Sequence, residues 1–391
     1  MKILATSNHG NTFNPKEGAD ARKYNLLMEL VKNNEVFVLE SDRYQGDKNK
    51  VTSIIPITYF HDFFISKYPL SFILDFNLSY IAKMISLVKN KKFDIIQISF
   101  CYGIIVTKII TFFINKKTKV IYDAHNVEAE IIIKTSSPNF NPLIKWFFWI
   151  YVPLVERLAV KFADHIICVS ENDRLSFIQK YAISSSKIDL IPSGTKIRPI
   201  IANNFNKDAI RRLFDINENK LVILFHGTYK YAPNKEAMDS IVNYIAPKVH
   251  EKFEHALFLL AGNGVPVFEK SNVKSVGFVE NLDSLLYVSD IAIVPIINGG
   301  GTRLKVLDYM SVGLPIVSTE KGIEGIEFTA GKDAIVCGDV NTEFVEEIIY
   351  LLKNEKKRME IGMNAYNLSK NIYDWQVIGK KLQEVYSKMI S

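Results

Sequence analysis

The chain has 391 residues, which is more than one ordinary hydrophobic core needs and predicts two domains. Its composition is globular, at 48% hydrophobic and 23% charged residues, and excludes a disordered or fibrous chain. The net charge of +6 lies wholly in the first half: residues 1–190 hold 24 basic and 18 acidic side chains, and residues 191–391 hold 24 of each. This imbalance favours an anionic partner, such as a phospholipid surface or a phosphorylated acceptor, about as strongly as a plain solvated surface.

Cysteine usage and hydropathy indicate a reduced compartment and no membrane span. Cys101, Cys168 and Cys337 are far apart and each adjoins apolar residues, which is typical of reduced core thiols rather than disulfides or zinc ligands. Residues 1–7 are too short and polar for a signal peptide and predict a first strand. No window approaches the roughly 18 apolar residues of a spanning helix. We therefore expect a cytoplasmic protein that does not cross a membrane.

Short apolar runs alternate with helical patterns over the first half of the chain. Several runs are apolar throughout, which suits strands covered on both faces of a parallel sheet. The predicted strands are 2–7, 36–40, 93–99, 119–122, 165–170 and 187–191, and the predicted helices lie near 19–33, 78–90, 102–115, 141–163 and 171–182. This order predicts a doubly wound α/β domain.

A second α/β series follows Pro192-Ser-Gly194 and an irregular, polar stretch at 195–220. Its predicted strands are 221–226, 256–261, 273–276, 291–295, 315–318 and 334–336, with helices near 234–250, 281–288, 303–312 and 342–353 and a helical tail. The predicted domains are therefore 1–194 and 195–359, with a terminal helix at 360–391. Two such domains in series leave a cleft, where small-molecule sites usually lie.

The most informative segment joins a buried strand to a helix through the triple glycine Gly299–Gly301. Thr302 is the expected N-cap of that helix and Gly313 its expected C-terminal glycine. Arg303 and Lys305 lie in the first turn, where cations oppose the helix macrodipole unless an anion is bound. Bare amides, the dipole and two cations together predict a phosphate site.

Two further glycine turns follow predicted strands of the second domain. One contains Gly227 and Thr228, and the other contains Asn263 within Leu260–Gly264. Both lie at carboxyl ends of strands, which is the edge where open α/β sheets bind ligands. Each turn alone is a weak signal, but three on one edge are moderately specific.

Asp308 follows Lys305 by three residues and points the same way on the predicted helix. Its carboxylate can accept two hydrogen bonds from a vicinal diol such as a ribose. The alternative is a surface ion pair with Lys305, worth a few tenths of a kcal/mol. The neighbouring glycines favour the ligand role.

In the first domain, His125 follows a predicted strand and precedes a helix. It can bind a sugar hydroxyl or act as an acid or base, and a structural role is equally favoured. Glu128 is an acceptor-side candidate, although Glu128 and Asp123 also fit as acids at a helix start. Gly10 and Gly18 lie in a loop that either approaches a phosphate or acceptor or is a plain turn.

Two other segments favour structural roles. Ser170-Glu-Asn-Asp173 resembles a capping box with Asp in place of Glu. The aromatic run Trp146–Tyr151 is more typical of core than of a membrane anchor. Together with the basic first half it leaves peripheral contact with an anionic membrane open.

The absence of several sequence motifs argues against some metal, nucleotide and cofactor sites. The sequence has no Asp-x-Asp, His-Glu-x-x-His or Cys-x-x-Cys, and no Gly-x-x-x-x-Gly-Lys-Ser/Thr loop. No Gly-x-Gly-x-x-Gly follows the first strand of either domain, which argues against a nicotinamide dehydrogenase. We therefore expect no metal and no cofactor, with phosphate handled by the backbone, Arg and Lys. No pattern indicates nucleic acid as a partner.

At these residues the chain resembles a GT-B glycosyltransferase of family 4, the group 1 glycosyl transferases, over nearly its whole length. The core motif is Gly299-Gly-Gly-Thr-Arg-Leu-Lys-Val-Leu-Asp308 with Met310, Gly313–Thr319 and Gly322–Gly325; it is supported by Phe225–Tyr229, Pro233–Asn234, Gly277–Glu280, Ile167–Ser170 and Ile191–Gly194. Family members commonly carry two glutamates flanking seven residues, and here those places hold Gly300 and Asp308. The usual Asn before the interdomain glycine is Ser193.

The resemblance implies two Rossmann-like domains facing each other across a cleft, with a terminal helix returning to the first domain. It places a nucleotide-sugar donor mainly on the second domain. The implied donor contacts are Gly227, Thr228, Arg303 and Lys305 at the diphosphate, Phe278 and Val279 near the base, and Asp308 at the ribose. It places His125 near the transferred sugar, and Gly10 and Gly18 at the acceptor.

The expected activity is metal-independent, retaining transfer of a hexose-type sugar onto a hydroxyl of a growing surface glycan or lipid-linked acceptor. Arg303, Lys305 and the turn amides would stabilise charge on the departing β-phosphate. No side chain is an obvious covalent nucleophile, which favours a front-face route. Two alternatives remain: a nucleotide-sugar 2-epimerase of the same fold, and a non-catalytic sugar-nucleotide binding partner.

Overall fold

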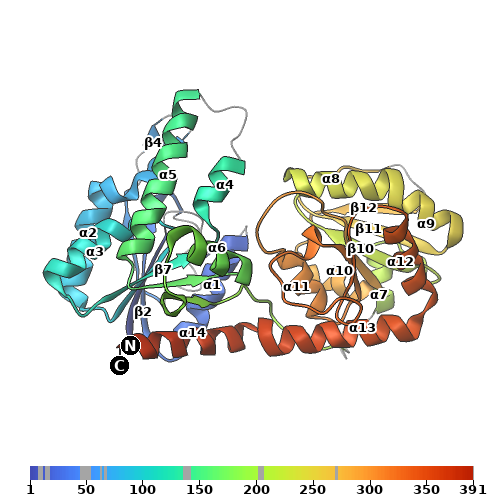
Figure 1. The fold of residues 1–391 in the computed structure, drawn as a ribbon. Coiled ribbons are helices and arrows are strands. Elements are labelled where there is room, and N and C mark those ends of the chain that lie inside the picture. Colours follow the sequence, from blue (N-terminus) through green and yellow to red (C-terminus); the bar gives the residue numbers. More distant parts are fainter. Residues whose placement is uncertain are drawn as a thin grey trace. The chain divides into compact units, whose positions relative to one another are not determined.

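The structure, a computed structural model, describes residues 1–7, 12–13, 18–44, 54–61, 64–65, 68–134, 142–200, 207–268 and 272–390. It divides into two compact units (Figure 1). The first unit comprises Met1–Ser193 together with Trp375–Ser391, and the second comprises Gly194–Asp374. Each unit is built around its own parallel sheet, as the alternation of apolar runs and helices predicts.

The sheet of the first unit has seven strands, which pair in parallel throughout. In spatial order they are β3 (Ile57–Phe60), β2 (Glu35–Ser41), β1 (Lys2–Ser7), β6 (Ile95–Ser99), β7 (Lys119–Ala124), β8 (His165–Cys168) and β9 (Ile188–Leu190). A small antiparallel pair, β4 (Phe64–Ile65) and β5 (Tyr68–Pro69), stands apart from this sheet. The sequence pattern did not predict β3, β4 or β5, because these strands are short and lie at an edge or outside the sheet.

Helices cover both faces of this sheet. They are α1 (Gly18–Leu30), α2 (Leu78–Lys91), α3 (Ile104–Ile114), α4 (Glu128–Lys134), α5 (Pro142–Phe162), α6 (Glu171–Tyr181) and α14 (Trp375–Ile390). One core cluster joins α1 and α14 to one face, and another joins α2, α3, α5 and α6 to the other. Alternate residues of β6 serve the two clusters, since Ile95 belongs to the first and Ile96 to the second.

The long helix α5 extends past the sheet at its N-terminal end (Figure 1). Phe148 and Tyr151 pack against the core, but Trp146 and Phe147 are exposed. The prediction that the run Trp146–Tyr151 belongs to the core is therefore wrong for part of it. The cause is that residues 146–152 of α5 are apolar on every side of the helix while only one side faces the sheet.

The sheet of the second unit has six parallel strands. In spatial order they are β12 (Val273–Gly277), β11 (Ala256–Ala261), β10 (Leu221–His226), β13 (Ile291–Val294), β14 (Ile316–Thr319) and β15 (Ile335–Cys337). The strands predicted at 221–226 and 256–261 have these same bounds, and the others differ by one or two residues.

The helices of the second unit are α7 (Lys207–Leu213), α8 (Ala232–Ser240), α9 (Ala246–Lys252), α10 (Leu282–Val288), α11 (Leu304–Met310), α12 (Thr342–Lys353) and α13 (Glu355–Leu368). A π-helical turn, Ile241–Ile245, joins α8 to α9, so the helix predicted at 234–250 has three parts. Helix α7 corrects the expectation that residues 195–220 are irregular throughout. Short 3-10 helices lie at Asp42–Tyr44, Leu70–Phe76, Ser185–Lys187 and Lys321–Ile323.

The terminal helix expected at 360–391 is interrupted. Helix α13 ends at Leu368, a π-helical segment runs over Ser369–Tyr373, and Asp374 is extended. The backbone N–H of Thr195 donates to the carbonyl of Tyr373 at 2.8 Å, which holds the chain there. Only α14 packs on the first unit, against α1, and the preceding residues belong to the second unit.

Both sheets reverse their winding direction at an internal strand. In the first unit this switch point lies between β1 and β6, and in the second between β10 and β13. Open α/β sheets bind ligands beside the carboxyl ends of the strands at such points. None of the described helices is long and apolar enough to cross a membrane. All three cysteines are buried and free, as predicted.

Candidate functional site

The glycine–cation segment lies at the switch point of the second unit, between the end of β13 and the start of α11. Gly299 and Gly301 have positive φ angles of 96° and 83°, a conformation that glycine adopts most readily. A Cβ on Gly299 would also come within 2.8 Å of Pro233 Cγ. A Cβ on Gly300 would meet no atom within 4 Å among the described residues, so this position is open.

Arg303 is the N-cap residue of α11 and is buried. Its guanidinium donates to the carbonyl of Gly300 at 3.2 Å and to that of Asn298 at 3.1 Å. No carboxylate pairs with it in the part of the chain that the structure describes. The cation is therefore compensated only by neutral carbonyl groups, which is costly for a buried charge.

The N-cap prediction for Thr302 is wrong. Arg303 occupies the capping position, and no side chain caps the helix there. The Thr302 hydroxyl is buried without a hydrogen-bond partner among the described atoms. At the other end of α11, Gly313 has φ 76°, and its N–H donates to the carbonyl of Met310 while that of Leu314 donates to Tyr309. These bonds form a Schellman motif and confirm Gly313 as the C-terminal glycine.

Lys305 is the second residue of α11, and its side chain reaches back toward β10. Its Nζ donates to Asn234 Oδ1 at 2.7 Å and lies 4.0 Å from the centre of the Phe225 ring. Burial, together with the charge of Arg303, lowers the pKa of Lys305 well below its usual value. Asn234 in turn donates from Nδ2 to the carbonyl of Thr228 at 3.0 Å. The contact between Asn234 and Lys305 spans 71 residues, which sequence spacing does not reveal.

The predicted turns after β10 and β11 meet beside Lys305. A Cβ on Gly227 would lie 2.9 Å from Lys305 Nζ, and one on Gly262 would lie 2.0 Å from the Gly227 carbonyl oxygen. Only glycines allow this approach. Thr228 and Asn263 are exposed, and the Asn263 carbonyl accepts from the Tyr229 N–H at 3.0 Å. The structure therefore brings Gly227, Thr228 and Asn263 together with the cations.

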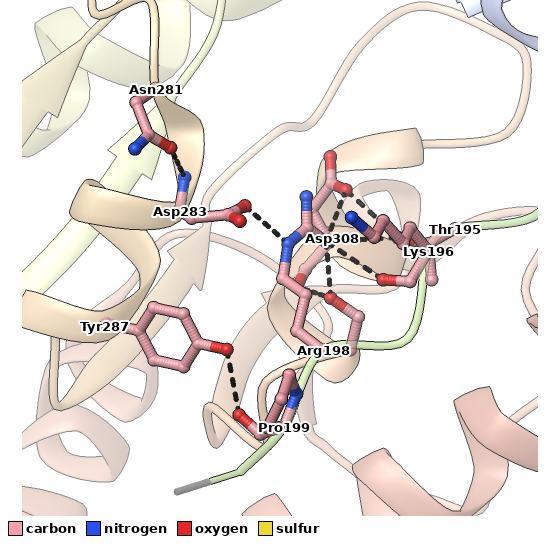
Figure 2. A network of polar contacts seen from close by, with 9 residues as sticks. Thr195, Lys196, Arg198, Pro199, Asn281, Asp283, Tyr287 and Asp308 are labelled. Atoms are coloured by element: carbon pink, nitrogen blue, oxygen red, sulfur yellow. Dashed lines mark hydrogen bonds and ion pairs between the residues drawn. The ribbon is translucent and has the colours of Figure 1, made fainter. Parts of the chain in front are cut away.

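Asp308 contacts a different group of residues (Figure 2). Its Oδ1 accepts from Thr195 Oγ1 at 3.1 Å and from Arg198 Nη1 at 3.4 Å. The alternative of an ion pair with Lys305 is wrong, since Lys305 reaches Asn234 instead. Burial raises the pKa of Asp308, and Arg198 opposes that shift.

Arg198 joins Asp308 to the loop that follows β12. Its Nε donates to Asp283 Oδ1 at 2.6 Å in the first turn of α10, a helix capped by Asn281 (Figure 2). Phe278 and Val279 precede that cap, and Phe278 is exposed. Sequence reasoning missed Arg198, because its partners lie 85 and 110 residues further along the chain.

His226, at the end of β10, is a second residue that sequence reasoning missed. Its ring lies edge-on to Tyr309, and its Nε2 is buried without a partner among the described atoms. Burial lowers its pKa to about 3, and the charges of Lys305 and Arg198 add to that shift. The neighbourhood of α11 therefore disfavours any further positive charge.

In the first unit, His125 is buried and stacks on Phe100 with ring centroids 4.7 Å apart. Its Nε2 lies 3.4 Å from Asp123 Oδ2, and burial lowers its pKa. Asp123 ends β7 and pairs with Arg22 at 3.0 Å, so it is not an acid at a helix start. Burial alone would raise the pKa of Asp123, but Arg22 and His125 hold it below its usual range.

Glu128 begins α4, as the helix-start alternative predicts. Burial and the neighbouring Glu156 raise its pKa to about 8. Glu156, from α5, caps this helix by accepting from the backbone N–H groups of Glu128 at 2.8 Å and Ala129 at 3.0 Å. Gly18 is the first residue of α1 rather than part of a loop, and Gly10 lies outside the described residues.

Comparison with protein families gives two matches. Residues 18–198 match the Glycosyltransferase Family 4 model, and residues 220–354 match the model described as Glycosyl transferases group 1. Together these matches cover most of both units. Among the described residues, no group of three or more His, Cys, Asp or Glu could hold a metal ion.

Similar proteins include a 44.6 kDa protein of the cps region of Klebsiella pneumoniae, 26% identical over 73% of this chain and 72% of that protein. The Escherichia coli UDP-Gal:alpha-D-GlcNAc-diphosphoundecaprenol alpha-1,3-galactosyltransferase is 21% identical over 51% of each chain. Among solved structures, HepE of Anabaena in complex with UDP superposes with a TM-score of 0.72 at 16% identity, covering 99% of this chain and 100% of that chain.

Proposed function

The chain belongs to the family 4, group 1 glycosyltransferases with the GT-B fold, and we propose from that premise that it is a retaining, metal-independent enzyme. In this proposal it transfers a sugar from a nucleoside diphosphate donor to a hydroxyl group. The observation that carries the proposal is the uncompensated charge at α11. Burial and then the nearby charge of Arg303 lower the pKa of Lys305, and neither cation forms an ion pair within the described chain.

A donor diphosphate would reverse the electrostatics of this site. The end of β10, the Gly299–Gly301 turn and the start of α11 supply backbone N–H groups and positive charge at one switch point. Binding an anion there compensates Arg303 and restores the favourable protonated form of Lys305. HepE of Anabaena was solved with UDP, which supports a uridine nucleotide as the first donor to test.

The chemistry follows from where charge develops. As the bond between the sugar C1 and the β-phosphate oxygen breaks, negative charge grows on that phosphate. Arg303, Lys305 and the turn amides stabilise it without reorganising. The acceptor oxygen forms a new bond to C1 on the same face, and its proton passes to the departing phosphate. Asp308 accepts from the ribose, and Phe278 with Val279 lie along the base.

For the acceptor we propose a sugar hydroxyl of a lipid-linked or surface glycan. The name of the Escherichia coli relative specifies a diphosphoundecaprenol-linked sugar as its acceptor, which supports this class. In this proposal His125 lies near the transferred sugar, and Glu128, Gly10 and Gly18 are the acceptor-side residues of the first unit. The basic first half favours work at the anionic inner face of the cell membrane.

Transfer from a radiolabelled UDP-sugar, measured with and without EDTA, tests the proposal. Lys305→Ala should lower kcat on the order of 10²–10³, which is typical when one preorganised charge-stabilising donor is removed. Lys235→Ala is the matched control, since Lys235 is exposed on α8 of the same unit and pairs with Asp239. Activity lost to the chelator would contradict the metal-independent route, and an unchanged Lys305→Ala rate would remove Lys305 from the mechanism.

Product analysis separates the alternatives. Incubation with donor alone identifies an epimerase, because epimerisation needs no acceptor. Donor binding without turnover over a broad acceptor panel identifies a non-catalytic partner, which Gly300 in place of the usual glutamate makes worth testing. Release of a sugar with inverted anomeric configuration would contradict retention.

A further inference from the structure

Helix α5 carries an exposed apolar stripe opposite its buried side. Trp146, Phe147, Ile150 and Leu154, here called the α5 stripe, are 63%, 44%, 52% and 53% exposed. Their spacing of one, three and four residues places them on one helix face. Val152, Val155 and Ala159 on the opposite side are buried in the core. A helix that is apolar on both sides needs a second apolar surface to cover it.

The exposed charges that continue the helix face of the stripe are positive. Arg157 and Lys161 continue the same helix face and are exposed, and the only acid of α5, Glu156, is buried as the cap of α4. Helix α3, which packs against α5, contains no acid, whereas α4, which also packs against α5, carries Glu128 and Glu130. Lys108 of α3 pairs with Asp164, so Arg157 and Lys161 are the exposed cations on which the charge of this helix face rests.

We propose that the α5 stripe docks this protein on an anionic phospholipid surface. Tryptophan and phenylalanine favour the boundary between headgroups and acyl chains, and each nearby cation is attracted by anionic lipid. A second copy of the chain fits less well, because a symmetric contact would place these cations against one another. The proposal deepens the lipid-linked acceptor of the proposed function, but its test needs no catalysis.

Sedimentation of the full chain with phosphatidylcholine vesicles, with and without phosphatidylglycerol, tests this surface. Wild type should bind the mixed vesicles and release from them as salt rises. The double variant Trp146→Ser, Phe147→Ser should bind about tenfold more weakly or worse, since it loses two aromatic anchors. Arg157→Glu with Lys161→Glu should abolish the preference for anionic vesicles. Met359→Ser, an exposed apolar residue of α13, is the matched control.

Three results would contradict the proposal that the α5 stripe docks on an anionic phospholipid surface. These are wild type that stays in the supernatant with anionic vesicles, a stripe variant that sediments like wild type, and a wild-type dimer that the stripe variant dissociates. Transfer to a water-soluble acceptor should be the same in wild type and the stripe variant. If the stripe variant binds vesicles normally while the enzyme still transfers sugar, the proposed membrane contact of the α5 stripe is refuted. The proposed glycosyltransferase function is then unaffected.

An independent observation concerns Arg198, in the segment that follows the first crossing between the units. It is held at both ends: Nε by Asp283, and Nη1 by Ser311 Oγ at 2.7 Å as well as by Asp308. Its backbone N–H donates to the carbonyl of Ser311 at 3.1 Å. Figure 2 shows Arg198 between Asp283 and Asp308, and Thr195 beside Asp308, to whose Oδ1 it also donates.

The geometry points to Arg198 as a positioning residue for nucleotide binding, an inference that rests on the proposed ribose contact of Asp308. Both described hydrogen bonds to the Asp308 carboxylate go to Oδ1. Arg198 and Thr195 fix Oδ1 by hydrogen bonds, so that Oδ2 is presented to a ribose hydroxyl. Because Arg198 also binds Asp283, it fixes the ribose carboxylate relative to the helix that follows Phe278 and Val279.

Binding of UDP and of 2′,3′-dideoxy-UDP, measured by calorimetry, tests this role. Wild type should prefer UDP by about tenfold or more, since a hydrogen bond to a charged group is lost in the analogue. Asp308→Asn and Arg198→Met should both shrink that ratio, and combining them should shrink it no further. Arg212→Met, an exposed arginine of α7, should keep the wild-type ratio.

A purely structural role for Arg198 makes a different prediction. Arg198→Met would then weaken both nucleotides equally and leave their ratio unchanged, which would overturn the inference. Wild type that binds UDP without preferring it over the dideoxy analogue would remove Asp308 from the ribose. A wild type that binds no nucleoside diphosphate at all would contradict the proposed function itself.

Discussion

Both units bury an arginine at the carboxyl edge of a parallel sheet, but only one of these arginines has an acid partner. Arg22 is 1% exposed and pairs with Asp123, whereas Arg303 is 6% exposed and contacts only carbonyl oxygens among the described residues. Each guanidinium has an Nε without a hydrogen-bond partner, so this atom does not distinguish them. The carboxylate does distinguish them: Arg22 has an acid partner within the first unit, and Arg303 has none among the described residues, as the proposed anion site requires.

The network around Arg22 is closed within the first unit. Asp123 Oδ2 accepts from Gln97 Nε2 at 2.9 Å, and Gln97 Oε1 accepts from Tyr386 Oη at 2.6 Å. Tyr386 belongs to α14, so the network ties the returning helix to the sheet. A buried polar network in which the charges are paired holds elements together. Among the described residues Arg303 has no such acid, and in the proposed function a donor diphosphate takes that place.

The largest effect on stability is expected when Arg22, the arginine with an acid partner, is replaced. Arg22→Met should destabilise the first unit by about 3–5 kcal/mol, because Asp123 is left buried without its cation. All three tryptophans, Trp146, Trp149 and Trp375, lie in the first unit, so urea unfolding followed by tryptophan fluorescence reports on that unit. Arg303→Met should leave this transition in place. Equal urea midpoints for Arg22→Met and wild type would contradict a stabilising role of the Arg22–Asp123 pair in the first unit.

In the second unit, where Arg303 has no acid partner among the described residues, a bound anion should increase stability. UDP at 100 times its Kd should raise the free energy of opening by about 2.7 kcal/mol. Hydrogen exchange of peptides covering β10 and α11 measures this effect. Arg303→Met should abolish the added protection, since it removes the cation that the diphosphate compensates. Protection by UDP that survives in Arg303→Met would place the anion elsewhere.

A smaller effect is expected on acid stability. His226 has a pKa of about 3 in the folded protein, against about 6.5 for an unperturbed histidine, so the unfolded chain binds its proton first as the pH falls. Stability should therefore fall by about 1.4 kcal/mol for each pH unit below about 6.5, which amounts to about 2 kcal/mol between pH 7 and pH 5. His226→Phe keeps an aromatic ring beside Tyr309 and should remove this slope. Hydrogen exchange of β10 at pH 7 and pH 5 checks it, with little difference expected at pH 7.

The smallest effect is expected at the open position of the glycine turn. Gly300→Glu places its Cβ where the described residues leave room, so stability should change by less than about 0.5 kcal/mol. Gly299→Ala, at φ 96° and against Pro233, should destabilise by about 1–3 kcal/mol. Thermal unfolding compares the two variants. If the Gly300→Glu protein is as unstable as the Gly299→Ala protein, the turn has no room for a side chain at either position.

Local patterns accounted for the parts of the site that lie close together in sequence. The glycines and cations from Gly299 to Lys305 are seven residues, so their residue types alone indicate an anion site after a strand. The bounds of β1, β10 and β11 follow from continuous apolar runs, because strands of a parallel sheet are buried on both faces. The extra strands β3, β4 and β5 and helix α7 carry too short an apolar pattern to be predicted.

What the sequence determined by itself is the sheet architecture and one polar segment with unbalanced charge. Only the tertiary structure decided which charges are balanced. Asn234 reaches Lys305, Arg198 reaches Asp308 and Arg22 reaches Asp123 over separations of 71, 110 and 101 residues. Adjacent strands of a parallel sheet are joined by long crossovers, so contacts at its carboxyl edge connect residues that no sequence period relates. Among the described residues, the missing acid beside Arg303 distinguishes the proposed binding site from a structural ion pair. It can be recognised only in the folded chain, where the crossovers have brought distant residues together.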